Sequence, residues 1–311
     1  MLLLDYQNVL IQSVLTERFS GAPPVNIDQT VSDFDGVKFH ISTPESKSKI
    51  IVSVQLSCFN ELVKYGALQA LEREDDLIRR ISLMKRNAMA APFEHAFDEH
   101  HTLAEEASKF TSEEAPQGVR EGGNVKAIHY RDEEAIYVKA SYDRVTVIFS
   151  TLFRDETDRV FGKVFVQEFV DARRRAIQNA PQVLFRTDPP LELQGVPGVS
   201  DSGKGEIGYV TFGLLDQPKM DSFGLIAIVL FPRHLTQQRR DEVISHIQTF
   251  RDYFHYHIKA SKVNLNLFIA DKNTDTPQAY IHSRMRRRTA DFLQVLRRAH
   301  PENEEREKKT A

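Results

Sequence analysis

Residues 135–152 read AIYVKASYDRVTVIFSTL, and this stretch decides the fold class. It contains two runs rich in β-branched and aromatic residues, Ala135–Ala140 and Arg144–Leu152, with a short polar turn between them. Runs of this length and composition, bounded by turn residues, are typical of neighbouring strands. The centre of the chain is therefore expected to form a β-sheet.

The same order of elements occurs twice along the chain. Residues 84–101 have the four-residue spacing of apolar side chains that indicates a helix, and this helix precedes the strand pair. Earlier, a helix with Ile11 and Leu15 on one side precedes two strand signals, Val37–Ser42 and Ile50–Leu56. Helix, loop, strand, turn and strand, repeated, predict two related α/β units.

The expected fold class is α+β: two related α/β units of helices packed on small, mostly antiparallel sheets, plus a long C-terminal helix. A further helix is expected at Glu61–Glu74 and a further strand at Lys163–Glu168. We place a first α/β domain at residues 1–80 and a second at 81–234. The long helix then occupies 235–311 and ends in a basic, polar tail.

The C-terminal helix carries a narrow row of apolar residues, which we call the apolar seam. Its upstream half comprises Val243, Ile247, Phe250, Phe254 and Ile258, and its downstream half comprises Ile281, Met285, Phe292 and Leu296. A terminal helix usually folds back on its own domain, but a pattern this long favours a partner helix. The nine residues are therefore candidate subunit-interface positions, and we expect Phe250 and Phe254 to be exposed in the isolated chain.

Composition excludes several classes of protein. With 311 residues, 41% of them hydrophobic and 27% charged, the chain has enough apolar side chains for a core in two domains. Cys58 is the single cysteine, which excludes an internal disulfide or a thiolate zinc site. No apolar run reaches the roughly eighteen residues of a membrane span, so no membrane span is expected.

No motif in the sequence supports an enzyme, a cofactor or a metal. Residues 198–205, GVSDSGKG, have the spacing of a phosphate-binding loop, but glycine stands where the magnesium-binding Ser or Thr belongs and a strand follows. A second group on the helix at 84–101 has metal-ligand chemistry: His95, Asp98, Glu99, His100 and His101. An exposed, charged helix face explains this group more simply than a metal site does.

Basic residues are concentrated toward the C-terminus. From Thr236 onward there are fifteen Lys/Arg and ten Asp/Glu, although the whole chain has a net charge of -3. This asymmetry indicates an acidic partner, such as nucleic acid, a membrane surface or an acidic protein surface. A solvated helix face is the ordinary alternative. A nucleic-acid or acidic-ligand binding protein that uses a basic helix is the alternative function.

A set of segments, taken in order, carries a resemblance to a known family. These are FDGVKFHIS, LMKRN, HYRDEEAIYV, DRVTVIFSTLF, GKVFVQEF, APQVLF, PPLEL, GYVTF, VLFPRH, TFRDYFHYHIK and YIHSRMR. The chain resembles the family of actin-related protein 2/3 complex subunit 2. This resemblance implies a non-enzymatic scaffold subunit with two α/β domains and a long helix. It also implies pairing with subunit 4 and other complex subunits, contact with the side of the mother actin filament, and no nucleotide or nucleic acid bound.

The resemblance also implies locations for the contacts. It places the protein in the cytoplasm and cytoskeleton, at cortical actin patches, and places subunit 4 on the apolar seam. The candidate filament-binding residues are Arg284, Arg286, Arg287, Arg288 and Arg297, with Lys163, Arg173, Arg174 and Arg175 as additional positions.

Three departures from the family pattern stand out. Residues 213–228 interrupt a strand and residues 263–278 interrupt the long helix, whereas a stretch of the family is missing near 75–82, so the first sheet is expected to lack a strand there. Each interruption is read either as an unspliced intron in the gene model or as a genuine loop. On both readings, 263–278 should loop out of the helix, which should resume near Ala279.

Overall fold

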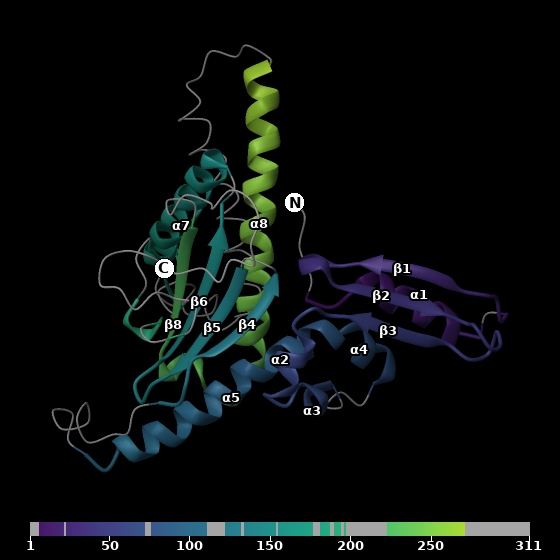
Figure 1. Cartoon of the computed structure of the whole chain (residues 1–311), viewed down its shortest axis with the longest axis horizontal. Coiled ribbons are helices and arrows are strands. Elements are labelled where there is room, and N and C mark those ends of the chain that lie inside the picture. The colour runs from purple at the N-terminus through teal and green to yellow at the C-terminus, as the bar shows by residue number, and fades with distance from the viewer. Residues whose placement is uncertain are drawn as a thin grey trace, which may run out of the picture.

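The computed structural model describes most of the chain. The described residues are 6–21, 23–71, 76–110, 122–131, 134–153, 155–176, 181–186, 190–193, 196 and 223–270. They form two lobes, which we define as residues 6–82 and 84–270 (Figure 1). Each lobe contains helices and one antiparallel sheet, and a long helix is present near the C-terminus. The predicted α+β class is therefore confirmed.

The first lobe is a small sheet covered by a helix. Its elements are α1 (Val9–Phe19), β1 (Asp28–Ser32), β2 (Lys38–Ser42) and β3 (Ile51–Gln55). The strands pair antiparallel in the order β1-β2-β3. Ile11 and Leu15 of α1 are buried together with Phe39 and Ile41 of β2. The short, polar β1 was not anticipated from the sequence.

Three short helices complete the first lobe: α2 (Phe59–Val63), α3 (Ala67–Leu71) and α4 (Leu77–Ser82). The prediction of one helix over Glu61–Glu74 is wrong, because the chain turns at Gly66, whose φ of 88° is in the left-handed region that favours glycine. The first sheet was expected to lack a strand near residues 75–82. In the structure, residues Leu77–Ser82 form a helix.

The second lobe is larger. Its elements are α5 (Met84–Ala107), β4 (Lys126–Arg131), β5 (Glu134–Ala140), β6 (Val145–Leu152), α7 (Glu156–Ala176), β7 (Gln182–Arg186), β8 (Phe223–Leu230) and α8 (Arg240–Ala270), with the short turns η2 (Leu191–Leu193) and η4 (Pro232–His234). The sheet is antiparallel with strand order β4-β5-β6-β8-β7. The strand pair predicted at 135–152 is confirmed as β5 and β6.

Alternation along the strands divides the second sheet into two faces. Val147 and Phe149 of β6 join the main core with α5, α7 and α8, whereas Ile148 lies on the opposite face with Leu225 and Ala227. Because side chains alternate along a strand, one face carries the helices and the other a smaller cluster.

One predicted element has the wrong type. Residues Lys163–Glu168 were expected to form a strand, but they lie within helix α7. Phe161, Phe165 and Phe169 are spaced four apart and are all buried, so they form one apolar helix face. The helical period, rather than the β-branched residues between these rings, determines the structure here.

The two interruptions of the family pattern contribute to regular elements. Residues 223–228 form most of β8, which is hydrogen-bonded between β6 and β7. Residues 263–270 continue α8 without a break. The prediction that 263–278 loops out of the helix is therefore wrong for its first half, while 271–278 and the expected resumption at Ala279 lie outside the described residues.

Candidate functional site at the junction of the two lobes

The β1–β2 turn of the first lobe carries an acidic residue in an uncommon backbone conformation. Asp35 and Gly36 have φ values of 66° and 72°. Aspartate is among the few residues that tolerate this left-handed region. The turn is closed by the Asp33 N–H, which donates to the Val37 carbonyl at 2.8 Å, and the Asp33 side chain accepts from the Phe34 N–H at 2.6 Å. The sequence DFDG thus presents the Asp35 carboxylate at a rigid tip.

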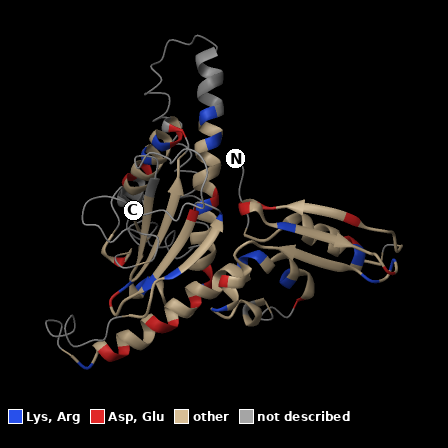
Figure 2. Cartoon of the chain, in the orientation of Figure 1, with Lys and Arg blue, Asp and Glu red and all other residues tan. Residues whose placement is uncertain are grey.

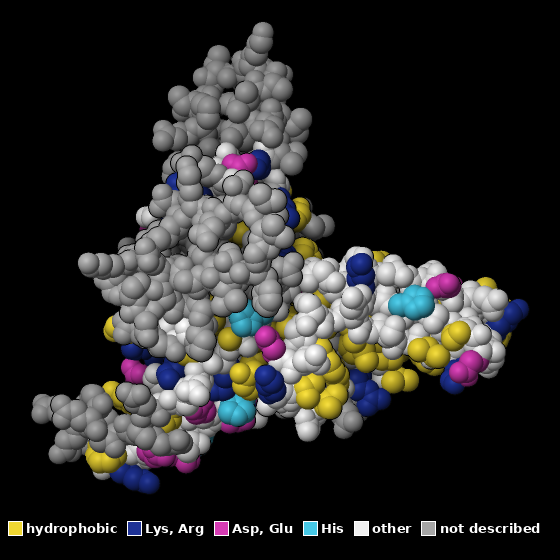
Figure 3. Space-filling model, viewed as in Figure 1, with side chains coloured by type: hydrophobic (Ala, Val, Ile, Leu, Met, Phe, Trp, Pro, Cys, Tyr) yellow, Lys and Arg dark blue, Asp and Glu magenta, His cyan; other side chains and the backbone are white. Residues whose placement is uncertain are grey.

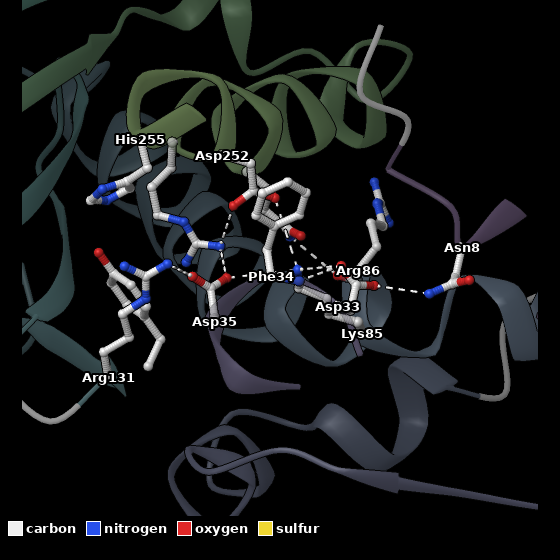
Figure 4. A network of polar contacts seen from close by, with 12 residues as sticks. Asn8, Asp33, Phe34, Asp35, Lys85, Arg86, Arg131, Asp252 and His255 are labelled. Carbon is white, nitrogen blue, oxygen red and sulfur yellow. Dashed lines mark hydrogen bonds and ion pairs between the residues drawn. The ribbon is translucent and has the colours of Figure 1, made fainter. Parts of the chain in front are cut away.

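The Asp35 carboxylate lies among cations of the second lobe (Figure 4). It pairs with Arg251 of α8, and the side chains of both residues are only 2% exposed. Its other oxygen is 3.2 Å from the Arg131 guanidinium at the end of β4. A carboxylate buried this deeply is stable only when it is paired and hydrogen-bonded.

Lys85 at the start of α5 extends this cluster. Its Nζ lies 3.3 Å from Asp33, 3.7 Å from Asp35 and 3.8 Å from Asp252. The side chain of Asn8, at the N-cap of α1, donates to the other Asp33 oxygen at 3.2 Å. The Lys85 ammonium group of the second lobe therefore connects the Asp33 and Asp35 carboxylates of the first lobe with the Asp252 carboxylate of the second lobe.

A tyrosine and a glutamate complete the far side of the cluster. The Arg251 guanidinium lies over the Tyr130 ring, 4.3 Å from its centroid, which is a close cation–π geometry. The Tyr130 hydroxyl donates to Glu134 at 3.3 Å, and Glu134 also accepts from Arg131 at 3.1 Å and from the Leu152 N–H at 3.3 Å. We call these residues the ionic junction: Asp33, Asp35, Lys85, Tyr130, Arg131, Glu134, Arg251 and Asp252.

The ionic junction shifts the pKa values of its members in different directions. Burial alone would raise the pKa of Asp35, but Arg251, Lys85 and Arg131 hold it below its ordinary value. Burial raises the pKa of Asp252 and the pKa of Glu134, because their cationic neighbours only partly compensate the loss of water. Asp35 is therefore the carboxylate that the cations stabilise most clearly.

A pocket of about 580 Å³ opens beside the ionic junction, lined by residues of both lobes. His255 lines it, 3.8 Å from Glu134, and burial lowers the pKa of His255 to about 3, so the ring is neutral at physiological pH. With a pKa of about 3 the His255 ring is a weak base, and Arg131 in the pocket wall is paired with Asp35 and Glu134. Within the described residues, no group of three or more His, Cys, Asp or Glu could hold a metal ion. The arrangement joins the lobes through buried, paired charges.

The upstream half of the apolar seam is in the core of the second lobe. Val243, Ile247, Phe250, Phe254 and Ile258 are all buried. Phe250 lies 5.3 Å from Phe169 and Phe254 lies 5.8 Å from Phe165, measured between ring centroids. The prediction that Phe250 and Phe254 are exposed in the isolated chain is wrong. The aromatic face of α7, which was mistaken for a strand, supplies the partner surface within the same chain.

The other sequence-predicted positions are only partly described. Lys163 is exposed on α7. Arg173, Arg174 and Arg175 lie in the last turns of α7, and their side chains are outside the described part. Ile281, Met285, Phe292 and Leu296 of the seam lie outside the described residues, as do Arg284, Arg286, Arg287, Arg288 and Arg297.

The histidine and acidic group on α5 has a structural use. His100 is buried and its Nδ1 lies 2.6 Å from the Ser141 carbonyl. Glu99 accepts from Lys126 at 2.6 Å, and Asp98 accepts from Arg240 at 2.6 Å. The interpretation of this group as a solvated helix face is therefore wrong in part, since three of its members attach α5 to the sheet and to α8.

Sequence reasoning missed the ionic junction, although its residues lie in quoted segments. Asp35 is in FDGVKFHIS, Lys85 in LMKRN, Arg131 in HYRDEEAIYV and Arg251 in TFRDYFHYHIK. Arg251 directly follows Phe250 of the apolar seam. A charged residue next to a buried position was the one available signal of a buried ion pair. Figure 2 shows both signs of charge where α8 and β4 meet the first lobe.

No helix in the described ranges is both long and apolar enough to cross a bilayer.

Comparisons with known proteins give a consistent result. A family model described as "Arp2/3 complex, 34 kD subunit p34-Arc" matches residues 69–221 and 215–303. The two matches meet within 213–228, where the sequence departs from the family pattern.

Two curated relatives are named actin-related protein 2/3 complex subunit 2. One, from Schizosaccharomyces pombe, is 46% identical over an alignment 345 positions long, gaps included, covering 100% of this chain and 98% of that protein. The other, from Dictyostelium discoideum, is 34% identical over an alignment 330 positions long, gaps included, covering 97% of this chain and 94% of that protein.

Proposed function

This chain belongs to the p34-Arc family of Arp2/3 complex subunits, and we propose that it pairs with subunit 4 to form the scaffold core of the complex and contacts the side of the mother actin filament during branched nucleation. The observation that carries the proposal is similarity over the full chain to two proteins named as that subunit. The proposed role is structural, in the cytoplasm and the cytoskeleton at cortical actin patches.

The buried contacts between the parts of the molecule support a scaffold role. A scaffold must hold distant contact surfaces at fixed positions, which requires that its parts be joined by buried contacts. Here α8 is packed against α7 by four phenylalanine rings, and the ionic junction attaches α8 to the first lobe. Both lobes are thereby fixed to one long helix (Figure 1).

Pairing with subunit 4 is proposed for the downstream half of the apolar seam, Ile281, Met285, Phe292 and Leu296. The upstream half is already filled by side chains of its own lobe, so a partner helix has no access to that face. Affinity purification of the tagged chain from its own cells tests this pairing. Recovery of subunit 4 and the other complex subunits is expected, and recovery of nucleic acid without them would favour the alternative function.

Filament contact is proposed for the arginines at 284, 286, 287, 288 and 297, with Lys163 and Arg173–Arg175 as additional positions. Guanidinium groups bind carboxylates in a bidentate geometry, so these arginines suit a filament side that presents acidic side chains. In the reconstituted complex, replacing Arg286 and Arg288 by Glu should weaken co-sedimentation with filaments while assembly is retained.

The matched control makes the same change of charge as the Arg286 and Arg288 variant, but on a different surface of the chain. Lys47→Glu with Lys49→Glu reverses two exposed charges in the turn between β2 and β3. This control should co-sediment like the wild type, and wild-type binding should weaken as salt is raised, since exposed charges are screened beyond about 10 Å at 0.1 M. Normal binding by the Arg286 and Arg288 variant would refute the assignment.

A further inference from the structure

The two lobes are joined by one short backbone connection and by side chains. Helix α4 of the first lobe ends at Ser82 and α5 begins at Met84, so the connection is a single residue. Away from it, the β1–β2 turn places Asp35 against the second lobe (Figure 4). Helices α2 and α3 also pack against α5 of the second lobe, with Leu62 and Ala67 in the same apolar core as Met89 and Phe93. The ionic junction is the buried charged part of this contact, on the side of the β1–β2 turn.

Three cations from three separate elements hold Asp35. Arg131 comes from β4, Lys85 from α5 and Arg251 from α8, and the Asp35 side chain is 2% exposed between them. A rotation of the first lobe changes the distance from Asp35 to all three cations together. It also leaves buried charges of both lobes without partners, which is unfavourable until water reaches them.

From this geometry we propose that Asp35 is a latch: its buried carboxylate fixes the orientation of the first lobe relative to the second, and its loss frees the lobes to move while each keeps its own fold. The rigid left-handed turn sets the position of the carboxylate. The apolar packing inside each lobe does not involve Asp35, because Phe39 and Ile41 pack beneath α1 and Phe165 and Phe254 pack between α7 and α8, although one continuous apolar core runs through both lobes.

The test measures the distance between the lobes in the full chain. Lys47→Cys in the first lobe and Gln167→Cys on α7 are both exposed positions for spin labels. The native Cys58 is buried, and burial raises its thiol pKa to about 11, so it resists labelling under native conditions. Double electron–electron resonance then gives the distribution of interlobe distances.

Asp35→Asn is the informative variant, because asparagine keeps the size and tolerates the same backbone conformation. We expect a single narrow distance distribution in the wild type and a broad one in Asp35→Asn, with hydrogen exchange still slow in both sheets. The matched control Glu45→Gln, which breaks the exposed pair with Lys49, should leave the distribution narrow.

An equally narrow distribution in a folded Asp35→Asn chain would overturn the latch. If Asp35→Asn does not fold, Arg131→Gln decides, because the Arg131 side chain is 33% exposed at the rim of the cluster and its loss removes one of the three cations. Broadening in that variant supports the latch and no broadening refutes it. The measurement needs neither filaments nor subunit 4, so its outcome is independent of the proposed function.

Discussion

The two sheets of the molecule differ in how they are stabilised. The five-stranded sheet has α5, α7 and α8 on one face and a second cluster on the other. The three-stranded sheet is covered by α1 on one face, while Lys38 and His40 of β2 point outward on the other. A three-stranded sheet with α1 and three short helices is near the lower limit for an independent fold. The first lobe is therefore expected to depend on its neighbours more than the second does.

The surface of the first lobe agrees with this difference. Leu10 and Phe19 of α1 and Leu68 of α3 are 63%, 57% and 52% exposed. Figure 3 shows hydrophobic side chains spread over this lobe. Single exposed apolar residues are ordinary, but a small lobe that leaves several outside its core gains less from burial. The comparison predicts that the second lobe is the more stable of the two. It also predicts that changes at the ionic junction alter the stability of the first lobe.

The largest expected effect is in the second lobe. Phe254→Ala should lower the free energy of unfolding by about 3 to 5 kcal/mol, because it empties a fully buried aromatic site. The Phe254 ring contacts Phe153 and Phe165. Urea unfolding followed by circular dichroism measures the change.

The control for this variant is Leu191→Ala, at a side chain that is 78% exposed. It should change stability by no more than about 0.5 kcal/mol. Phe254→Ala should also reduce recovery of the assembled complex, but through unfolding of the second lobe. If Phe254→Ala instead lost pairing with subunit 4 while its free energy of unfolding stayed at the wild-type value, Phe254 would be an interface residue.

A somewhat smaller effect is expected at the ionic junction. Arg251→Met should destabilise the chain by about 3 kcal/mol, the lower end of the cost of breaking a buried ion pair, since methionine still fills the space. Asp35 then keeps Lys85 and Arg131 as partners. Denaturant unfolding with a probe in each lobe should show the first lobe unfolding earlier than in the wild type.

An exposed pair on the same lobe gives the comparison. His40 lies 2.7 Å from Asp28, but their side chains are 46% and 86% exposed. His40→Ala should therefore cost well under about 1 kcal/mol. Equal effects of Arg251→Met and His40→Ala would show that burial of the ionic junction is unimportant.

The sequence predicted the elements whose apolar spacing is regular. The strands β5 and β6, the helix α5 and the long helix α8 follow from alternation or from four-residue spacing, which report local burial directly. Helix α7 was misread because Val164 and Val166 alternate within the four-residue spacing of its phenylalanines. A short apolar run of this kind fits both periods, and only packing against α8 selects one of them.

The ionic junction could not be predicted in the same way. Asp35 and Arg251 are 216 residues apart in sequence, and no periodicity reports which charges meet. The seam on α8 shows a related limit, since an apolar face has the same spacing whether its partner is another subunit or its own lobe. What the spacing could not tell is that the phenylalanines of α7 pack against this face of α8.

The interrupted segments show that a break in a family pattern is not a break in structure. Residues 223–228 are central in the second sheet and 263–270 extend α8. The intron interpretation stays a prediction about the gene, and sequencing the mature transcript tests it. Both segments in spliced message would refute it.

A smaller, pH-dependent effect is expected from Glu134. Burial raises its pKa in the folded protein above the ordinary 4.5. Its contribution to stability is therefore fully present below its unfolded pKa and is lost as pH rises through the folded pKa. Glu134→Gln removes this titration, so the stability difference between wild type and variant should move in favour of the variant from about pH 4 to pH 7. Unfolding curves at both pH values measure it, and a difference independent of pH would contradict the shift.

The smallest effect on folding, and the sharpest separation of folding from function, is expected at Lys163. This side chain is exposed on α7, on a helix whose opposite face is buried by Phe161 and Phe165. Lys163→Glu should change the free energy of unfolding by no more than about 0.5 kcal/mol. In the reconstituted complex it should weaken filament co-sedimentation at low salt, with the difference from wild type shrinking as salt screens the reversed charge. Gln167→Glu, one turn further along α7 and also exposed, is the matched control for added negative charge. If both variants bind filaments like the wild type, α7 is not part of the filament surface, and the proposed contact is left to the arginines that follow α8.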